Sequence, residues 1–238
     1  MTLQEFSNGF DTLLNSYGRN NTFGLSYNLA FDEYEKSQFL TEAQKEIALL
    51  YYNGNTPDSK SFESTEEIRR SLSSIIREET LLPAVQGNVI KIEDNSKVFQ
   101  LPDDLWFITY ESVKVNNKCS SFSVQTVYPV RQDEYSKLKK NPFRGLNKRR
   151  ALRLDLGNNK VEVISNYDIE SYYVRYLKKL NPIVLVNLEN DLTIEGVNTA
   201  TESELPDIIH NRILDLAVRL ALRSRGIVSD NEGNKESN

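Results

Sequence analysis

The chain has 238 residues, of which 39% are hydrophobic and 26% are charged, and it carries a net charge of −5. This composition permits a hydrophobic core beneath a polar surface, and the length suits one large domain or a core domain with an insertion. The negative charge gives the molecule as a whole no nucleic-acid-binding signature. Its single cysteine excludes an internal disulfide and a cysteine-based zinc cluster. No stretch approaches the 18 apolar residues of a membrane span, so we expect no membrane partner, and we expect no signal peptide.

The first eighty residues are expected to be helical. Thr41 and Gln44 form a capping pattern that predicts a helix beginning at Thr41, and Gly54 offers a left-handed cap at its end. Ser64 and Glu67 repeat the capping pattern before another apolar stripe. A first short helix is predicted from apolar residues at helical spacing, namely Leu3, Phe6, Phe10, Leu13 and Leu14.

From Gly87 the apolar period changes to two, which predicts an antiparallel meander with short turns. The turns are expected at Asp94-Asn95, Asn116-Asn117 and Gly157-Asn158-Asn159, because asparagine and glycine tolerate positive φ. Later strands are predicted at residues 169–177, 183–188 and 192–197. Alternation in the first of these places Tyr172 and Tyr176 on one face and Tyr173 on the other, which favours core packing and leaves a subunit interface as the alternative.

A final helix is predicted from Leu205, and it is apolar over most of its girth. Such a helix is usually central in a bundle or shared with another subunit, so we expect Leu216 and Leu220 to be fully packed. A narrow charged strip remains on this helix, formed by Arg212, Asp215, Arg219 and Arg223. Residues 229–238 contain no apolar side chain and are expected to be disordered in isolation.

The predicted fold class is α+β, in which N-terminal helices and a long C-terminal helix form a bundle beside a central antiparallel β region. Residues 1–84 are expected to form the N-terminal helical part and residues 85–200 the antiparallel β region. Residues 201–226 are the C-terminal helix, which packs back on the bundle, and residues 227–238 are a flexible tail.

No catalytic, cofactor-binding or metal-binding motif is recognisable in the sequence. His210, the only histidine, lies in the final helix without a nucleophile elbow and is expected to face a neighbouring element. The ten glycines form no phosphate loop or dinucleotide fingerprint. A metal-dependent nuclease could use Asp103, Asp104 and Glu111 with Lys114, but adjacent aspartates after a proline are also ordinary turn residues.

The clearest charge feature is the basic segment, residues 137–150, which holds seven basic residues around Asn141-Pro142-Phe143. Three interpretations stay open: a solvated loop, a surface that docks on an acidic partner, and a grip on DNA phosphates. The acidic background argues against DNA as the main target. The interface residues that we expect are Phe143, Arg144, Lys148, Arg149, Arg212, Asp215, Arg219 and Arg223.

Several short pieces, taken in order, carry a resemblance that runs to about Ser224. They are Tyr34-Glu35-Lys36-Ser37, Phe62-Glu63-Ser64-Thr65-Glu66, Leu101-Pro102-Asp103-Asp104-Leu105-Trp106, Asp133-Glu134-Tyr135, Asn141-Pro142-Phe143-Arg144, Tyr176-Leu177-Lys178-Lys179 with Asn181-Pro182-Ile183, and Glu204-Leu205-Pro206. In this order they resemble the head–tail connector proteins, also called adaptor or ring proteins, of crAss-like tailed phages.

The resemblance implies a non-enzymatic structural protein of a phage virion, without cofactors. It implies a ring subunit of the head-to-tail connector below the portal, which links capsid to tail and forms part of the DNA channel. The implied partners are other copies in a dodecameric ring, the portal protein and other connector or tail proteins. Packaged DNA would pass through without sequence-specific binding.

The implied location is the virion, with the host cytoplasm during assembly. Simple adaptors are more purely helical, so the order of helices and strands here favours a lower ring over the portal-contacting one. The alternatives are a metal-dependent DNA-processing enzyme and a small regulatory binding protein outside the virion.

Overall fold

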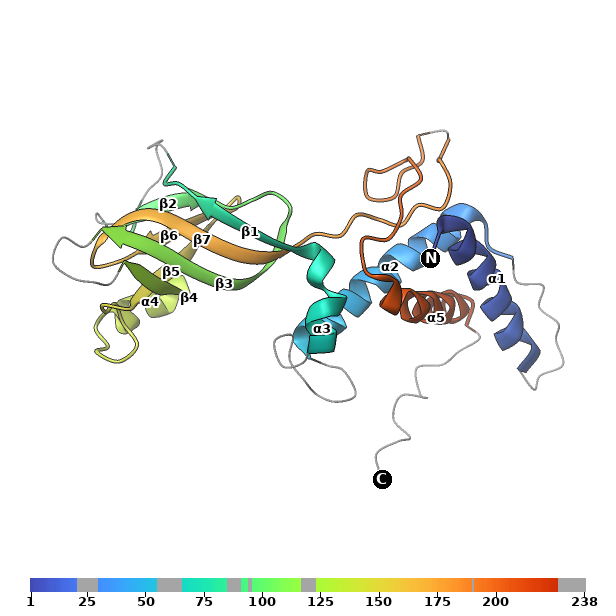
Figure 1. The fold of residues 1–238 in the computed structure, drawn as a ribbon, viewed down its shortest axis with the longest axis horizontal. Coiled ribbons are helices and arrows are strands. Elements are labelled where there is room, and N and C mark those ends of the chain that lie inside the picture. The colour runs from blue at the N-terminus through green and yellow to red at the C-terminus, as the bar shows by residue number, and fades with distance from the viewer. Residues whose placement is uncertain are drawn as a thin grey trace, which may run out of the picture. The chain divides into compact units, whose positions relative to one another are not determined.

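The computed structural model describes residues 1–20, 30–54, 66–84, 91–93, 96–116, 123–189 and 191–226. The chain divides into two compact units, which are drawn in Figure 1. Unit 1 comprises Met1–Ile75 and Leu180–Asn238, and unit 2 comprises Ile76–Lys179. Among the described residues, no helix has both the length and the hydrophobicity needed to cross a bilayer.

Unit 1 is helical. It contains α1 (Leu3–Asn20), α2 (Glu33–Asn53), α3 (Glu66–Ser71), a 3-10 turn at Ser73–Ile75 and α5 (Asp207–Ser224). The predicted first helix is confirmed, and so is the left-handed cap at Gly54, where φ is 71°. The predicted helix start at Thr41 is wrong, because Asp32 caps α2 nine residues before Thr41. The Asp32 carboxylate accepts a hydrogen bond from the Glu35 backbone N–H at 2.7 Å, and the Glu35 side chain accepts one from the Asp32 N–H.

Polar side chains of α2 hold an irregular stretch that follows unit 2. Ser37 Oγ accepts the Leu185 N–H at 3.0 Å, and Thr41 Oγ1 accepts the Ile183 N–H at 3.1 Å. The strands predicted at residues 183–188 and 192–197 are wrong. These residues form only isolated bridges. In the first segment, side chains of α2 rather than a neighbouring strand take up the backbone N–H groups of Ile183 and Leu185.

The predicted helical bundle is also wrong. α5 has 18 residues, as many as α1 and fewer than the 21 of α2, so it is not the long helix on which a bundle would depend. It does pack against both helices: Gly9 lets α1 come so close that an added Cβ would lie 2.7 Å from Leu214 Cδ2, and Arg212 bonds to Tyr51 of α2. The irregular stretch, rather than a further helix, covers another part of α2.

The charged residue Lys36 is buried in unit 1 and joins α2 to α1. Its ammonium lies 2.8 Å from Asp11 and 3.0 Å from Glu33, and only 4% of the residue is exposed. Burial lowers the pKa of Lys36, but the hydrogen bonds and charges of the two carboxylates outweigh this and hold that pKa above its ordinary value. Lys36 therefore stays charged and ties the two helices together.

Unit 2 is a curled seven-stranded sheet (Figure 1). Its strands are β1 (Ile76–Leu81), β2 (Lys97–Gln100), β3 (Leu105–Asn116), β4 (Val124–Pro129), β5 (Arg150–Gly157), β6 (Lys160–Ile164) and β7 (Asp168–Lys178), in the order β1-β7-β3-β4-β5-β6-β2. β4 and β5 pair in parallel, which corrects the prediction of a wholly antiparallel region. The physical reason is the crossover through α4 (Gln132–Lys139) and the basic segment, which returns the chain in the same direction.

The hairpin between β5 and β6 is confirmed. Gly157, Asn158 and Asn159 have φ values of 85°, 51° and 55°, as this type of turn requires. The predicted turns at Asp94-Asn95 and Asn117, the Ser64 cap and the tail from residue 227 lie outside the described residues.

The inner face of the curled sheet forms the core of unit 2. Tyr172 and Tyr176 point into it and are almost fully buried, with Val174 between them, so the predicted alternation along this strand is confirmed. Just beyond β1, the Ala84 N–H donates to Val98 O of β2 at 2.8 Å, which brings the two edges of the sheet together. A smaller cluster, Tyr135, Leu152, Leu154 and Ile164, seats α4 on the outer face.

Candidate functional site

The acidic residues considered for a nuclease do not converge. Asp103 accepts a hydrogen bond from Asn159 at 3.2 Å, and Asp104 accepts one from the Tyr176 hydroxyl at 3.1 Å. Lys114 pairs with Glu170 at 2.8 Å. Across the described ranges, no group of three or more His, Cys, Asp or Glu side chains is placed to hold a metal ion. These residues act as turn and strand-end anchors.

Glu111 lies apart from them, inside the curled sheet. Its carboxylate lies 2.9 Å from Arg153 Nη1 of β5 and accepts the Tyr172 hydroxyl of β7 at 2.5 Å. Burial raises the pKa of Glu111, opposed by the Arg153 charge and by the hydrogen bond from Tyr172. Burial also raises the pKa of Tyr172, so its hydroxyl remains a donor. These two contacts of Glu111 join strands β3, β5 and β7.

A second buried carboxylate, Glu162 of β6, is also used structurally. It accepts backbone N–H groups from Ile92 at 3.0 Å and Glu93 at 3.1 Å, and the Ser96 hydroxyl at 2.5 Å. These bonds fix the chain that enters β2. The Glu162 carboxylate is fully buried and is engaged by these hydrogen bonds.

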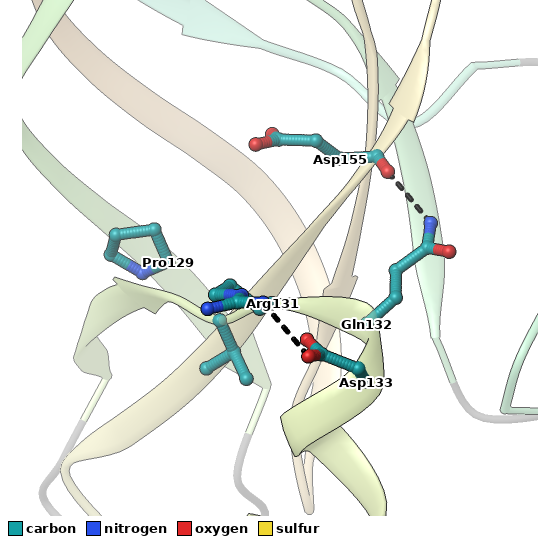
Figure 2. Close-up of a pocket in the computed structure, with 6 residues that line it drawn as sticks. Pro129, Arg131, Gln132, Asp133 and Asp155 are labelled. Atoms are coloured by element: carbon teal, nitrogen blue, oxygen red, sulfur yellow. Dashed lines mark hydrogen bonds and ion pairs between the residues drawn. The ribbon is translucent and has the colours of Figure 1, made fainter.

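An open pocket of about 510 Å³ lies at the start of α4 (Figure 2). Its lining is Pro129, Val130, Arg131, Gln132, Asp133 and Asp155. Figure 2 shows Arg131 paired with Asp133, at 2.9 Å, and the Gln132 amide donating to the Asp155 carbonyl, at 2.8 Å. The polar groups therefore bond to one another along the wall and do not converge on a reacting centre.

The basic segment contains a loop that is held by its own hydrogen bonds and has an exposed phenylalanine at its tip. Asn141 Oδ1 accepts the N–H groups of Phe143 and Arg144, at 2.9 and 3.0 Å, and Asn141 O accepts that of Gly145 at 2.8 Å. Arg150 donates to the Phe143 carbonyl at 2.9 Å. The loop is thus shaped by its own hydrogen bonds, while Phe143 remains 84% exposed.

Strand β4 anchors the far end of the same loop. Gln125 donates to the Asn147 carbonyl at 2.9 Å, and the Thr126 N–H donates to the Arg149 carbonyl at 2.9 Å. Four predicted interface residues are brought together and exposed here, namely Phe143, Arg144, Lys148 and Arg149. Within the described part of the chain, the side chains of Arg144 and Lys148 make no hydrogen bond or ion pair.

Gly145 is expected to be essential for this shape. A Cβ at this position would lie 2.6 Å from Asn141 O and 2.7 Å from Leu138 O, both of which are backbone atoms. Gly145→Ala should therefore shift the loop and speed hydrogen exchange at the Phe143 and Arg144 amides, with the exposed Lys140→Ala as control. Unchanged exchange in Gly145→Ala would contradict the described loop.

The other four predicted interface residues lie on α5, in unit 1. Arg212 donates to the Tyr51 hydroxyl of α2, and Asp215 accepts from Tyr17 of α1 at 2.9 Å. Asp215 also pairs with Arg219 at 2.9 Å, while Arg219 and Arg223 are exposed. The strip on α5 therefore serves in part to hold the helices of its own unit.

Sequence reasoning missed an aromatic stripe on the outer face of the sheet. Tyr110 of β3 and Tyr128 of β4 are 44% and 45% exposed, and the Tyr110 ring lies 6.2 Å from that of Tyr173 on β7. The Arg150 guanidinium stands 4.5 Å from the Tyr128 ring centre. The alternation of apolar and polar residues along β3 and β4 could have revealed these tyrosines. Tyrosines on the solvent face of a strand are typical of a surface suited to a partner.

His210 is buried against α1 and is not displayed for catalysis. Its Nε2 lies 2.8 Å from the Leu205 carbonyl, and its ring lies 5.1 Å from that of Phe6. Burial is the main cause that lowers the pKa of His210, against the hydrogen bond to the Leu205 carbonyl.

We expect the free energy of unfolding to fall as the pH drops below 6.5, the ordinary pKa of histidine. The unfolded state then binds a proton at His210 that the folded state binds only at lower pH. A nuclear magnetic resonance titration of this single imidazole should give a midpoint below 6.5, and His210→Gln should remove this part of the pH dependence. A midpoint above 6.5 would contradict the buried, neutral histidine.

Comparison with known proteins identifies the family. A family model described as phage tail ring protein 3/4 matches residues 1–233. The chain belongs to this family. It is 42% identical to "Ring protein 3" of Bacteroides phage crAss001 over 240 residues, which cover 99% of this chain and 100% of the relative. It is 34% identical to "Ring protein 4/5" of the same phage, over 93% of this chain and 92% of the relative. The resemblance to ring proteins of crAss-like phages is confirmed, and this phage tail ring protein is a structural component of a virion.

Proposed function

We propose that this ring protein is a non-enzymatic subunit of the head-to-tail connector, below the portal, where it links capsid to tail and forms part of the DNA channel. The observation that carries the proposal is the match to phage ring proteins along nearly the whole chain. The geometry agrees with it, because the acidic residues and the histidine considered for catalysis are engaged in holding the fold together.

The proposed partners are other copies of the chain in a dodecameric ring, the portal protein and other connector or tail proteins. Packaged DNA passes through the ring without sequence-specific binding, and assembly takes place in the host cytoplasm. The chain contains a seven-stranded sheet as well as helices, which favours a lower ring, since simple adaptors are more purely helical.

The proposed assembly surface is centred on Phe143, Arg144, Lys148 and Arg149. An exposed phenylalanine on a loop of fixed shape can enter a partner at little entropic cost, and the surrounding charges can orient the encounter. Arg219 and Arg223 form a second proposed contact on α5. A third proposed contact is the segment of residues 229–238, which contains no apolar side chain.

Quantitative mass spectrometry of purified particles tests the proposal. We expect this ring protein in a fixed stoichiometry to the portal protein, as a structural ring requires. Its absence from particles would contradict the proposal and favour a regulatory protein outside the virion. Metal-dependent DNA cleavage that disappears in Asp104→Ala would favour the nuclease instead.

A further inference from the structure

The two units of the chain carry opposite charge. Unit 2 contains 18 basic and 13 acidic residues, whereas the residues of unit 1 include 11 basic and 21 acidic ones. Unit 2 is therefore positive by 5 charges and unit 1 negative by 10. The net charge of −5 conceals this division, which gives each copy one surface that attracts the other surface of a second copy.

The positive charge of unit 2 is concentrated at the basic segment. No acidic residue occurs between Glu134 and Asp155, and the seven basic residues flank the exposed Phe143 in the sequence. Hydrogen bonds within the loop and to β4 fix its shape. The loop therefore has a fixed shape, with an apolar side chain at its tip and basic residues on both sides of that residue in the sequence.

Unit 1 carries a stretch with the complementary character, residues 180–211, here called the acidic segment. It contains six acidic residues, Glu189, Asp191, Glu195, Glu202, Glu204 and Asp207, and neither lysine nor arginine. Three of its aliphatic side chains are exposed: Val186 by 43%, Leu192 by 45% and Ile208 by 69%. Hydrogen bonds to Ser37 and Thr41 of α2 hold this segment in place.

A closed ring of identical subunits uses a heterologous contact, in which two different surfaces of each copy meet. We propose that the basic segment of one copy docks on the acidic segment of the next copy, with Phe143 against its exposed aliphatic side chains. This inference rests on the proposed ring function. It names the two surfaces that form the contact between neighbouring subunits.

The opposite charges steer and orient the encounter, so the association weakens as the salt concentration rises. The apolar contact at Phe143 supplies most of the affinity, because a buried aromatic anchor dominates many interfaces. Phe143→Ala should therefore weaken the association of copies by roughly 10-fold or more. The fold should be unaffected, since this side chain is 84% exposed.

Zero-length carbodiimide cross-linking of purified particles tests the contact on the native protein. This reagent joins a lysine to a carboxylate that lies against it. Bands of two or more copies are expected to contain Lys139, Lys140 or Lys148 joined to Glu189, Asp191, Glu195 or Glu202. Bands of two or more copies that lack these lysine–carboxylate pairs would overturn the proposal. It would also be overturned if these lysines were cross-linked only to carboxylates of the same copy or of a different protein. Absence of the chain from particles would instead refute the ring function itself.

Reversing the charges of the basic segment in one variant and of the acidic segment in another gives a second test with the purified chain. Variant A carries Arg144→Glu and Lys148→Glu, and variant B carries Glu189→Lys and Glu202→Lys; all four side chains are exposed. By sedimentation velocity at low salt, each variant alone should associate at least about 10-fold more weakly than the parent chain. An equal mixture should regain the association, because each reversed surface then meets its complement.

The matched control is Arg131→Glu with Lys114→Glu, which makes the same change in charge elsewhere on unit 2. These side chains are 74% and 61% exposed, and this variant should associate like the parent. All variants should keep the melting temperature of the parent within about 3 °C, as surface substitutions do. A mixture of A and B that associates no better than either variant alone would overturn the proposal.

Discussion

Replacing Arg153 by methionine is expected to lower the free energy of unfolding by about 3–5 kcal/mol, because the Glu111 carboxylate then stays buried without its cation. The pair lies at 2.9 Å, with only 11% of the Arg153 side chain and 7% of the Glu111 side chain exposed. The single tryptophan, Trp106, lies on β3 with Glu111 and reports unfolding of this unit by fluorescence in urea.

Two variants show whether the loss comes from an uncompensated charge. Arg131→Met breaks an exposed ion pair with Asp133 and should cost less than about 1 kcal/mol. Glu111→Leu combined with Arg153→Met removes both charges and should recover much of the stability lost in the single variant. An Arg153→Met protein as stable as the Arg131→Met control would contradict the buried contact.

Replacing Ile213 by alanine is expected to cost about 2–5 kcal/mol, because it opens a cavity where α5 packs in unit 1. Ile213 is fully buried. Ile208, on the same helix, is 69% exposed, and Ile208→Ala should change stability by less than about 0.5 kcal/mol. Thermal unfolding followed by circular dichroism compares the two variants, and equal losses would show that α5 is not packed as described.

The sequence pattern predicted only approximately which residues of α5 are buried. Leu216 and Leu220, predicted to be fully packed, are partly exposed, whereas Ile213, Ala217 and Val218 are buried. Apolar residues on most of the girth of a helix do not tell which side meets a neighbour. The contacts of Arg212 with Tyr51 and of Asp215 with Tyr17 set that side, and they depend on helices far away in the sequence.

Local chemistry explains which turns and caps were predictable. The β5–β6 hairpin was predictable because Gly157, Asn158 and Asn159 themselves favour positive φ. The capping pattern at Thr41 misled because Asp32 and Glu35 form an equivalent pair upstream, where the helix begins. Thr41 instead bonds to Ile183, a residue 142 positions away, and no local pattern indicates such a contact.

One feature of the candidate interface was predictable from the sequence and another was not. The exposure of Phe143 was predictable, because it lies between Pro142 and Arg144 in a loop rich in basic residues. The fixed shape of that loop was not, since it depends on the parallel pairing of β4 with β5 and on bonds from Gln125 and Thr126. Pairing between strands that a long crossover joins leaves no periodic signal in the sequence.

Pieces of sequence that carried the family resemblance have structural roles in this fold. Lys36 and Ser37 join α2 to α1 and to the acidic segment. Asp104 accepts the Tyr176 hydroxyl at the end of β7. Asn141 shapes the loop that presents Phe143. These pieces of sequence therefore hold elements of this fold together or shape one of its loops.

Cryo-electron microscopy of the connector region in purified particles tests the central claim most directly. We predict a closed ring of copies of this chain around the DNA channel below the portal, with the helical unit and the seven-stranded unit recognisable in each copy. A connector in which every ring is built from other proteins, with no density for this chain, would contradict the account.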